Sequence, residues 1–386
     1  MDLGFTDEQE MLRKAVRDLC AKYGDPEAIR ALEDDPTGYD PAFWQELAAM
    51  DLIGLTLPVE YGGSGMGPLE AVVVYEELGR SIVPSPHLVS AVVTGGLLAH
   101  AGSDELEQSW LPRIAGGDAI VTVAWHEPHR SDRPAALQLR VREEGDELVL
   151  DGVKNLVAFA SSAEAIVVLA RRGDGADDLD LVLVSADADG VELEQTTVGD
   201  SSAQYEVRFS GVRVPATNRV GDAGSGWQTF AYVMDDALIA VAAAAVGGAE
   251  RALEMTVDYA KERVQFGVPI GNFQGVAHPI ADAKTEVDGA RTLVHQAAWA
   301  RDAIGTGGAL PAMAKRFACE TYRRTTRMGH QVFGGVGFTR AIDIQLYFRR
   351  AKQLELQWFE PRTLADRIAA TELDSDHPLV GIDAGI

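Results

Sequence analysis

The sequence is short of cysteine and of basic residues, and both shortages limit its possible functions. Its two cysteines, Cys20 and Cys319, lie in helix-like stretches without metal-ligand or pairing spacing, which favours buried free thiols. The chain has 34 Lys and Arg residues against 59 Asp and Glu residues, for a formal net charge of -25. Such an acidic surface repels phosphate backbones and anionic lipid heads, so no nucleic acid and no membrane is expected as a partner.

Long hydrophobic runs and the common metal and nucleotide motifs are missing as well. The longest apolar run, 237–249, is shorter than the ~20 residues that span a bilayer and predicts a buried helix. No histidines stand at ligand spacing, there is no Cys-x-x-Cys, and no Gly-x-Gly-x-x-Gly follows a strand. We therefore expect no metal site and no Rossmann turn. The acidic opening after Met1 favours a cytoplasmic protein without a signal peptide.

What the chain does have is a large apolar content and a clear change of periodicity along its length. Its 386 residues are 46% hydrophobic, which suits two or three globular domains. Helical periodicity holds over 1–117, short β-rich segments follow over 118–225, and long helical stretches fill 226–370 before an acidic tail at 371–386. We predict an α+β, mostly α fold with an N-terminal helical domain, a middle β-barrel (or sandwich) domain and a C-terminal four-helix bundle.

Local patterns predict several element boundaries. Thr6 and Gln9 have the spacing of a capping box, and Asp40 before a proline marks a helix start. Leu88–Leu98 is apolar enough for a buried helix, and Asp151-Gly152 is typical of a turn between strands. The four bundle helices are expected at about 227–264, 277–304, 311–335 and 343–370.

Two segments of the last zone contain residues suited to an anionic ligand. Arg263 closes a long helix, and its forked guanidinium is a good donor to a pyrophosphate, although a solvated helix-end charge is the commoner role of such a residue. The stretch His330–Gly337 ends another helix with three glycines, which permit positive φ angles and a close approach of backbone to ligand. A simple helix stop would explain one glycine but not three.

Taken with other motifs in the same order, these segments resemble the acyl-CoA dehydrogenase family over almost the whole chain. The matching motifs are Leu55–Gly65, Glu127-Pro128 with Ser131-Asp132, Asp151–Lys154, Phe209–Ala216, Tyr259–Gly267 with Phe273-Gln274, and Gln331 with Gly334-Gly335. The resemblance implies FAD as the cofactor, bound in an extended form at the interface of a dimer or tetramer. It also implies which residues hold the adenine and pyrophosphate half of a neighbouring subunit's FAD: Arg263, Gln265, Phe266, Phe273, Gln274, Gln331, Gly334 and Gly335.

The half of the site that faces the flavin ring departs from the family pattern. His126 stands where the family usually has Thr, while Leu156 and Ala158 replace the ring-stacking aromatic residue and the hydroxyl near flavin N5. By the resemblance, His126 and Ala158 still line the flavin, and Ser131 and Asp235 lie on the substrate side. Backbone groups and His126 are the expected substitutes, so the flavin potential should differ from that of typical members.

The catalytic base is the least regular position. Removing an α-proton from an acyl thioester needs a positioned carboxylate in a dry pocket that raises its pKa, together with donors to the thioester oxygen. The family's two usual positions for a Glu fall on Trp358 and Ala237, neither of which is acidic. Glu360, two residues beyond the first position, is therefore the expected base, and Asp236 is the second candidate. The structural alternative for Glu360 is a cap on the helix that opens at Pro361.

Three functions follow from the resemblance. The first is an FAD-dependent acyl-CoA dehydrogenase of lipid β-oxidation, which desaturates the α,β bond of an acyl-CoA substrate and passes electrons to an electron-transfer flavoprotein. The second is a weakly catalytic or non-catalytic partner subunit that completes another chain's FAD site in a hetero-oligomer. The retained Arg263 segment and the altered ring-side residues would suit such a subunit. The third is an oxygen-using oxidase or flavin monooxygenase component.

The acyl group is indicated only indirectly. Leu238 replaces an Arg that often helps to bind the CoA side in the family. Small residues along the first bundle helix would leave room for a branched or ring-bearing acyl group, but tight helix packing is the favoured interpretation. These small residues are Ala237, Ala240 and 242–245.

Overall fold

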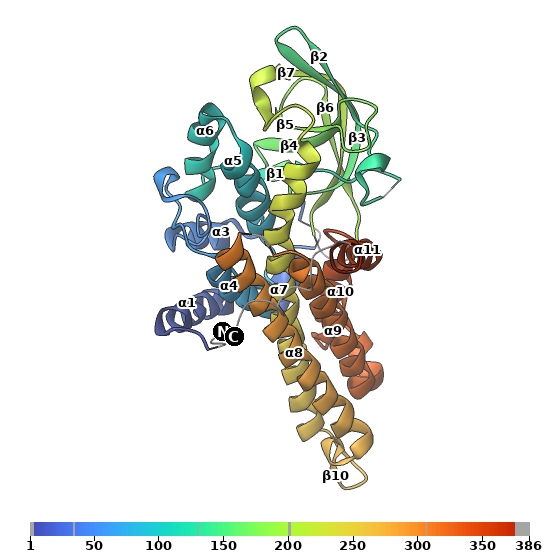
Figure 1. The fold of residues 1–386 in the computed structure, drawn as a ribbon. Helices are drawn as coiled ribbons and strands as arrows, with labels where there is room; N and C mark the ends of the chain where they lie inside the picture. Colours follow the sequence, from blue (N-terminus) through green and yellow to red (C-terminus); the bar gives the residue numbers. More distant parts are fainter. Residues whose placement is uncertain (1–3, 34, 130, 200–201, 306, 375–386) are drawn as a thin grey trace. The chain divides into compact units, whose positions relative to one another are not determined.

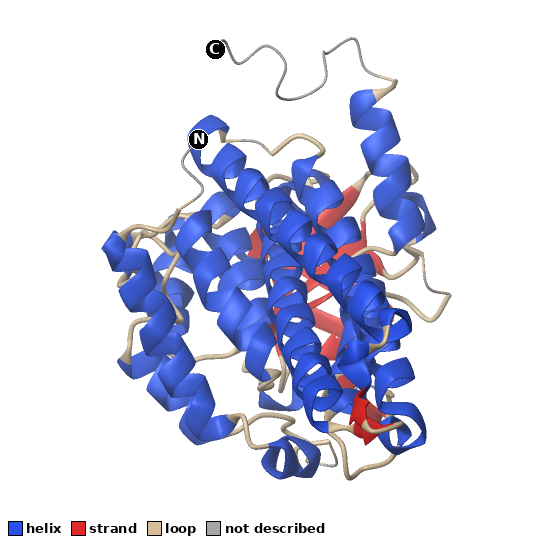
Figure 2. Cartoon of the chain, turned by 90° about the horizontal axis from the view of Figure 1, so that it is seen from below, coloured by secondary structure: helices blue, strands red, loops and turns tan. Residues whose placement is uncertain are grey.

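In the computed structural model, the described residues are 4–33, 35–129, 131–199, 202–305 and 307–374, and the chain divides into two compact units. The first unit combines Met1–Pro26, Pro68–Val83 and Leu238–Ile386, and the second combines Glu27–Gly67 and Pro84–Ala237. Most of the chain is helical, and the described strands form one eight-stranded sheet and one two-stranded hairpin (Figure 2). The α+β, mostly α fold is confirmed. The domain boundaries near residues 117, 225 and 370 stay predictions.

The second unit contains short helices before its sheet. Asp40 caps α3 (Pro41–Ala49) as expected, because its carboxylate accepts the N–H of Ala42 at 2.8 Å. The helix predicted at Leu88–Leu98 is largely buried, but Leu88–Gly95 is a π-helix that continues into α5 (Gly96–Ala101). The other helices are α2 (Pro26–Ala31, of which all but Pro26 lie in this unit), η1 (Val59–Tyr61) and α6 (Asp104–Ala115).

The sheet of the second unit is mostly antiparallel, with the strand order β6-β7-β3-β2-β4-β5-β8. Strand β1 pairs with β4 in parallel, outside that path. The strands are β1 (Val121–Ala124), β2 (Arg140–Glu144), β3 (Glu147–Ala158), β4 (Ala165–Arg171), β5 (Leu179–Ser185), β6 (Val191–Thr196), β7 (Gln204–Pro215) and β8 (Arg219–Val220). Short 3-10 turns lie at η3 (Pro134–Ala136), η4 (Ala160–Ser162) and η5 (Ala216–Asn218).

The turn predicted at Asp151-Gly152 is wrong, because both residues lie inside β3. The chain reverses earlier, between β2 and β3, at Gly145, whose φ is 66°. Gly152 instead permits a close approach, since an added Cβ would lie 2.8 Å from the side chain of Leu139. Asp151 stands at a register shift between β3 and β7, and its carboxylate accepts the N–H of Gly211 at 2.7 Å. A glycine inside a strand here marks close packing and an irregular ladder rather than a turn.

The first unit is built from long helices (Figure 1). The capping box of α1 (Asp7–Tyr23) is confirmed, because Thr6 Oγ1 accepts the N–H of Gln9 at 3.2 Å and Gln9 Oε1 accepts the N–H of Thr6 at 3.1 Å. The longest helix, α7 (Gly226–Glu262), belongs to this unit from Leu238 onward. The other long helices are α4 (Pro68–Ser81), α8 (Gln274–Ile304) and α9 (Leu310–Phe333).

The fourth bundle stretch, expected as one helix over 343–370, consists of two helices. Helix α10 (Ile344–Leu356) ends before the turn 357–360, and α11 (Pro361–Glu372) begins after it. Pro361 fits the first helical position, where its missing N–H is no loss. The first two residues of the predicted acidic tail, 371–372, continue α11, and 375–386 lie outside the described residues.

Helices α4 and α7 pack closely at glycine positions. An added Cβ at Gly79 of α4 would overlap the carbonyl of Ala244, and one at Gly247 would overlap the carbonyl of Glu76. At these points the small residues of α7 allow two backbones to meet, as the packing interpretation predicted. Helix α7 is also long and apolar enough to cross a membrane, but 78% of its most apolar window is buried within the protein.

Both cysteines are buried and free, as the sequence predicted. Burial raises the pKa of Cys20 to about 12 and that of Cys319 to about 11. Thiols with such high pKa values stay protonated near neutral pH and are poor nucleophiles. Among the described residues, no group of three or more His, Cys, Asp or Glu side chains is placed to hold a metal ion.

Candidate cofactor and catalytic site

A short hairpin joins α7 to α8 at one end of these two helices (Figure 1). Strand β9 (Val264–Gln265) pairs with β10 (Val268–Pro269), and the two residues between them have positive φ angles, 54° at Phe266 and 82° at Gly267. This geometry is that of a type I′ turn, in which a non-glycine residue is strained by roughly 1–2 kcal/mol. The Phe266 side chain is 94% exposed and meets the ring of Phe273 edge-on. A strained and exposed aromatic residue indicates a binding surface.

Arg263 stands at the base of this hairpin and is exposed. Two backbone hydrogen bonds fix its main chain. Its N–H donates to the carbonyl of Tyr259 at 2.9 Å, and its own carbonyl accepts the N–H of Ile270 at 2.8 Å. The exposed Gln274 opens α8, a helix of 31 residues whose N-terminal N–H groups favour anions. A guanidinium and a helix N-terminus that flank the same hairpin suit a phosphate group.

The glycine segment after α9 has the open geometry that its sequence predicts. Gly334 has a φ of 66°, and an added Cβ at Gly334 or Gly335 would meet no described atom within 4 Å. Gln331, in the last turn of α9, is exposed. Gly337 differs from the other two, since a Cβ there would lie 3.2 Å from the ring of His330. The first two glycines therefore leave room for a ligand, whereas Gly337 serves packing.

The buried ring of His330 supports this segment. It stacks on Phe338 with ring centroids 4.7 Å apart and meets Phe348 edge-on at 4.8 Å. Neither of its ring nitrogens has a hydrogen-bond partner among the described residues. Burial lowers the pKa of His330 below its usual value, so near neutral pH the ring acts as an uncharged aromatic packing residue.

In the second unit, a buried ion pair connects the end of β1 to β3. The ammonium of Lys154 is fully buried and donates to Glu127 Oε1 at 2.8 Å and to the Trp125 carbonyl at 3.2 Å. Glu127 also accepts the N–H groups of Gln138 and Leu139. Burial lowers the pKa of Lys154 from 10.5 to about 8, and the charge of Glu127 opposes that lowering. Glu127 and Lys154 belong to two of the motifs that resemble the family. The sequence contained one indication of their pairing, which is that Lys154 is a charged residue within an apolar, β-rich stretch.

Strand β3 has a bulge directly after Lys154. Its register against β7 shifts between Lys154 and Val157, and Leu156 has a φ of 52°. The N–H of Asn155 donates to the carbonyl of His126 at 3.0 Å, so the bulge is joined to the segment that follows β1. The Oδ1 atom of Asn155 is buried and has no hydrogen-bond partner among the described residues. Bulges of this kind re-aim side chains and are frequent beside active sites.

His126 and Ala158, the two residues expected beside the flavin, are both buried. Ala158 is the last residue of β3, and its carbonyl accepts the hydroxyl of Thr122 in β1 at 2.6 Å. Nδ1 of His126 lies 3.9 Å from Oδ1 of Asp132, which places a carboxylate beside the imidazole. The spacing of the sequence did not indicate that these two side chains would be neighbours.

Ser131 and Asp235, expected on the substrate side, belong to the same unit as His126. Ser131 is half-buried, and its hydroxyl accepts the N–H of Arg133 at 3.3 Å. Asp235 is buried in the first turns of α7, and Asp236 beside it is half-buried. The roles of Ser131 and Asp235 stay predictions.

Glu360 lies in the first unit, in the turn between α10 and α11, and is half-buried. It occupies the N-cap position of α11 but makes no side-chain capping hydrogen bond, so its carboxylate does not act as the alternative cap. The two residues before it, Trp358 and Phe359, are buried and have φ angles of 56° and 75°. Left-handed conformations cost roughly 1–3 kcal/mol each in non-glycine residues, and they persist where the surrounding structure enforces them.

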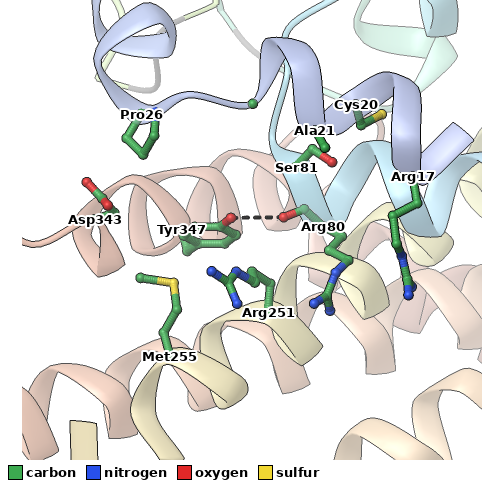
Figure 3. A pocket seen from close by; sticks show the side chains of 11 residues that line it. Arg17, Cys20, Ala21, Pro26, Arg80, Ser81, Arg251, Met255, Asp343 and Tyr347 are labelled. Atoms are coloured by element: carbon green, nitrogen blue, oxygen red, sulfur yellow. Dashed lines mark hydrogen bonds between the residues drawn. The ribbon is translucent and has the colours of Figure 1, made fainter. Parts of the chain in front are cut away.

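A cavity of about 310 Å³ in the first unit lies between α1, α4, α7 and α10 (Figure 3). Three arginines line it, Arg17, Arg80 and Arg251. Each guanidinium already contacts a carboxylate: Arg17 pairs with Glu77, whereas Arg80 and Arg251 share Glu254. Because carboxylates of the chain neutralise these cations, the cavity is not a ready site for an anionic ligand.

Comparison with known proteins shows that the chain is an oxidoreductase acting on CH–CH donors, and its fold agrees with that class. The family model of the acyl-CoA dehydrogenase N-terminal domain matches residues 6–118, and that of the acyl-CoA dehydrogenase C-terminal domain matches residues 224–356. The chain belongs to the acyl-CoA dehydrogenase family, which is FAD-dependent.

Individual relatives cover nearly the whole chain. The chain is 33% identical to the probable acyl-CoA dehydrogenase YngJ of Bacillus subtilis, over 92% of this chain and 95% of the relative. It is 32% identical to the cyclohex-1-ene-1-carbonyl-CoA dehydrogenase of Geobacter metallireducens, over 91% of this chain and 94% of the relative. A chain in the crystal structure of the ChsE4-ChsE5 complex from Mycobacterium tuberculosis is similar with a TM-score of 0.88 and 30% identity, covering 98% of this chain and 100% of that chain.

Several described residues have the chemistry that FAD requires. The buried, partnerless Oδ1 of Asn155 is an acceptor that the N–H group of a flavin ring would satisfy. In the first unit, Arg263 and the exposed ring of Phe266 offer a phosphate donor and an aromatic surface for the adenine half.

If Arg263 holds the pyrophosphate, as the family resemblance implies, the variant Arg263→Ala should bind FAD about 10- to 100-fold more weakly, because it removes a charge-assisted hydrogen-bond donor. FAD per chain, measured by absorbance after gel filtration, and the Kd of the apoprotein for added FAD check this. Lys261→Ala is the matched control, since Lys261 is an exposed cation two residues earlier. Full FAD content in Arg263→Ala would exclude Arg263 from the pyrophosphate site.

Proposed function

We propose that the chain is a catalytic acyl-CoA dehydrogenase that forms a double bond between the α and β carbons of an acyl-CoA. The carboxylate of Glu360 takes the α-proton and becomes a carboxylic acid. Bound FAD would supply the acceptor for the hydride of the β-carbon. The observation that carries this proposal is the turn 357–360, in which two buried, strained residues lead directly to a half-buried carboxylate.

Other residues of the chain support the reaction by position and polarity. The Lys154–Glu127 pair and the Asn155 bulge fix the backbone of the segment that carries His126, because Lys154 donates to the Trp125 carbonyl and the N–H of Asn155 donates to the His126 carbonyl. Fixed groups of this kind orient a ligand without reorganising during the reaction. In this proposal His126 and Ala158 line the flavin, and Ser131 and Asp235 contact the substrate.

We further propose that the electrons pass to an electron-transfer flavoprotein and that the chain acts as a dimer or tetramer. The exposure of Phe266 and the open backbone at Gly334 and Gly335 support this arrangement, because such surfaces are suited to a neighbouring subunit and its cofactor. The acyl-CoA substrate follows from the family. Because the chain is similar to a cyclohex-1-ene-1-carbonyl-CoA dehydrogenase, acyl-CoA thioesters with a ring in the acyl group are also worth testing.

A second candidate is a partner subunit that completes another chain's FAD site and contributes little catalysis. Two observations favour it. Leu156 and Ala158 stand at the ring-side positions without an aromatic ring or a hydroxyl, and the chain is similar to a component of the two-protein ChsE4-ChsE5 complex. Glu360 distinguishes the candidates, since a mere partner needs no base.

An anaerobic absorbance titration of the chain expressed alone tests the proposal. The panel contains straight, branched and ring-bearing saturated acyl-CoA thioesters, and loss of the oxidised flavin band reports reduction. We expect yellow protein and bleaching by at least one thioester. Colourless protein that gains FAD only when co-expressed with a homologous chain would favour the partner subunit. Rapid reoxidation by air after bleaching would favour the oxygen-using alternative.

A further inference from the structure

A fully buried lysine contacts the turn between α10 and α11. Lys315 of α9 has no exposed surface, and its ammonium donates to the Phe359 carbonyl at 2.8 Å and to the Glu355 carbonyl at 3.1 Å. One acceptor belongs to the last turn of α10, and the other belongs to the residue directly before Glu360. One side chain from α9 thus connects the end of α10 to the turn; the three helices α9, α10 and α11 are orange to red in Figure 1.

The surroundings explain how a buried cation is tolerated there. Burying a charge in a dry interior is costly unless neighbouring groups compensate it. The carbonyls at the C-terminal end of a helix carry partial negative charge and attract cations. Cys319, one turn along α9, donates to the Leu354 carbonyl at 3.5 Å. Helix α9 therefore provides donors to carbonyls that the end of α10 leaves without helical partners.

The same contact explains the strained backbone of the turn. Trp358 and Phe359 adopt left-handed conformations that non-glycine residues seldom adopt. Burial of both rings holds the side chains, while the bond from Lys315 holds the carbonyl of Phe359. The Phe359 carbonyl belongs to the peptide group that joins Phe359 to Glu360. Holding this carbonyl therefore also fixes where the backbone of Glu360 begins.

We propose that Lys315 is a positioning residue of the reaction, whose ammonium fixes the 357–360 turn and thereby the place of the Glu360 carboxylate. This inference rests on the proposed role of Glu360 as the base. Lys315 moves no proton in this scheme and acts only through Glu360.

The test is Lys315→Met, which nearly keeps the length of the side chain and removes its donors. We expect the rate of flavin reduction to fall about 10- to 100-fold, with FAD content and the Kd for acyl-CoA within about twofold, because misplacing a catalytic group slows the chemical step more than it weakens binding. A second readout does not depend on activity: amide hydrogen exchange at Gln357 and Leu364, which flank the turn, should become faster. Lys315→Arg retains donors and should recover part of both effects.

Lys352→Met is the matched control. It removes the same charge from an exposed lysine of α10 that pairs with the Glu355 carboxylate at 2.6 Å, and it should change neither the rate nor the exchange. If Lys315→Met does not fold, exchange in the unmodified protein decides the question. The amides of Gln357 and Leu364 should then exchange as slowly as core amides of α9, and exchange typical of a surface loop would overturn the inference.

The outcomes separate this inference from the proposed function. Unchanged exchange in Lys315→Met, or faster exchange with an unchanged rate, overturns the positioning role even if Glu360 proves to be the base. Loss of rate in Lys315→Met together with full activity of Glu360→Gln would remove Glu360 both as the group being positioned and as the base of the proposed function. Loss of rate in both variants, with faster exchange only in Lys315→Met, supports both.

Discussion

Glu360→Gln should retain FAD and acyl-CoA binding but reduce its flavin about 10²- to 10⁴-fold more slowly, the range expected when a general base is lost. The amide is nearly isosteric with the carboxylate, so the turn 357–360 keeps its shape, but the amide cannot take the α-proton. Anaerobic stopped-flow absorbance with a saturating acyl-CoA measures the rate. The Kd from a parallel titration shows whether binding is intact.

The matched comparison is Asp236→Asn, because Asp236 is the second candidate for the base. Asp236 is half-buried in α7 and stands beside Ala237, one of the two positions at which the family resemblance leads us to expect a Glu. We expect its amide variant to reduce the flavin at nearly the normal rate. The opposite pattern, with a slow Asp236→Asn and a fast Glu360→Gln, would assign the proton transfer to Asp236.

The second large effect is on stability: Lys154→Met should lower the free energy of unfolding by about 3–5 kcal/mol, the usual result of removing one partner of a buried ion pair. Lys154 is fully buried and Glu127 nearly so, and without the ammonium one carboxylate oxygen loses a donor inside the protein. Denaturant unfolding followed by circular dichroism measures the change. The bulge at Asn155 should also loosen, because it adjoins Lys154 in β3.

Two further variants test whether the loss of stability comes from the Glu127 carboxylate, which is left buried without its cation. Adding Glu127→Gln to Lys154→Met should recover part of the lost stability, because the remaining amide carries no charge. Arg213→Met removes a cation from an exposed cluster with Glu144 and Glu147, and solvent screening should leave its unfolding midpoint unchanged. A Lys154→Met midpoint equal to that of Arg213→Met would show that the buried pair does not hold β1 to β3.

The sequence by itself determined the family, the mostly helical fold and the local caps. Thr6 and Gln9 formed the expected capping box, because only four neighbouring residues are involved in that motif. The open glycine backbone at Gly334 was also predictable, since a residue without a Cβ tolerates positive φ. Such features depend on residue types at short spacing, and a single sequence contains all the information they need.

Tertiary structure decided the features that depend on residues far apart in the chain. Asp151-Gly152 has the composition of a turn, yet the close approach of Leu139 and the pairing with β7 keep it inside β3. The bond from Lys315 to the Phe359 carbonyl joins residues 44 positions apart. Periodicity along the chain cannot indicate such contacts, because packing energy and the need to pair buried polar groups select them only when distant segments meet.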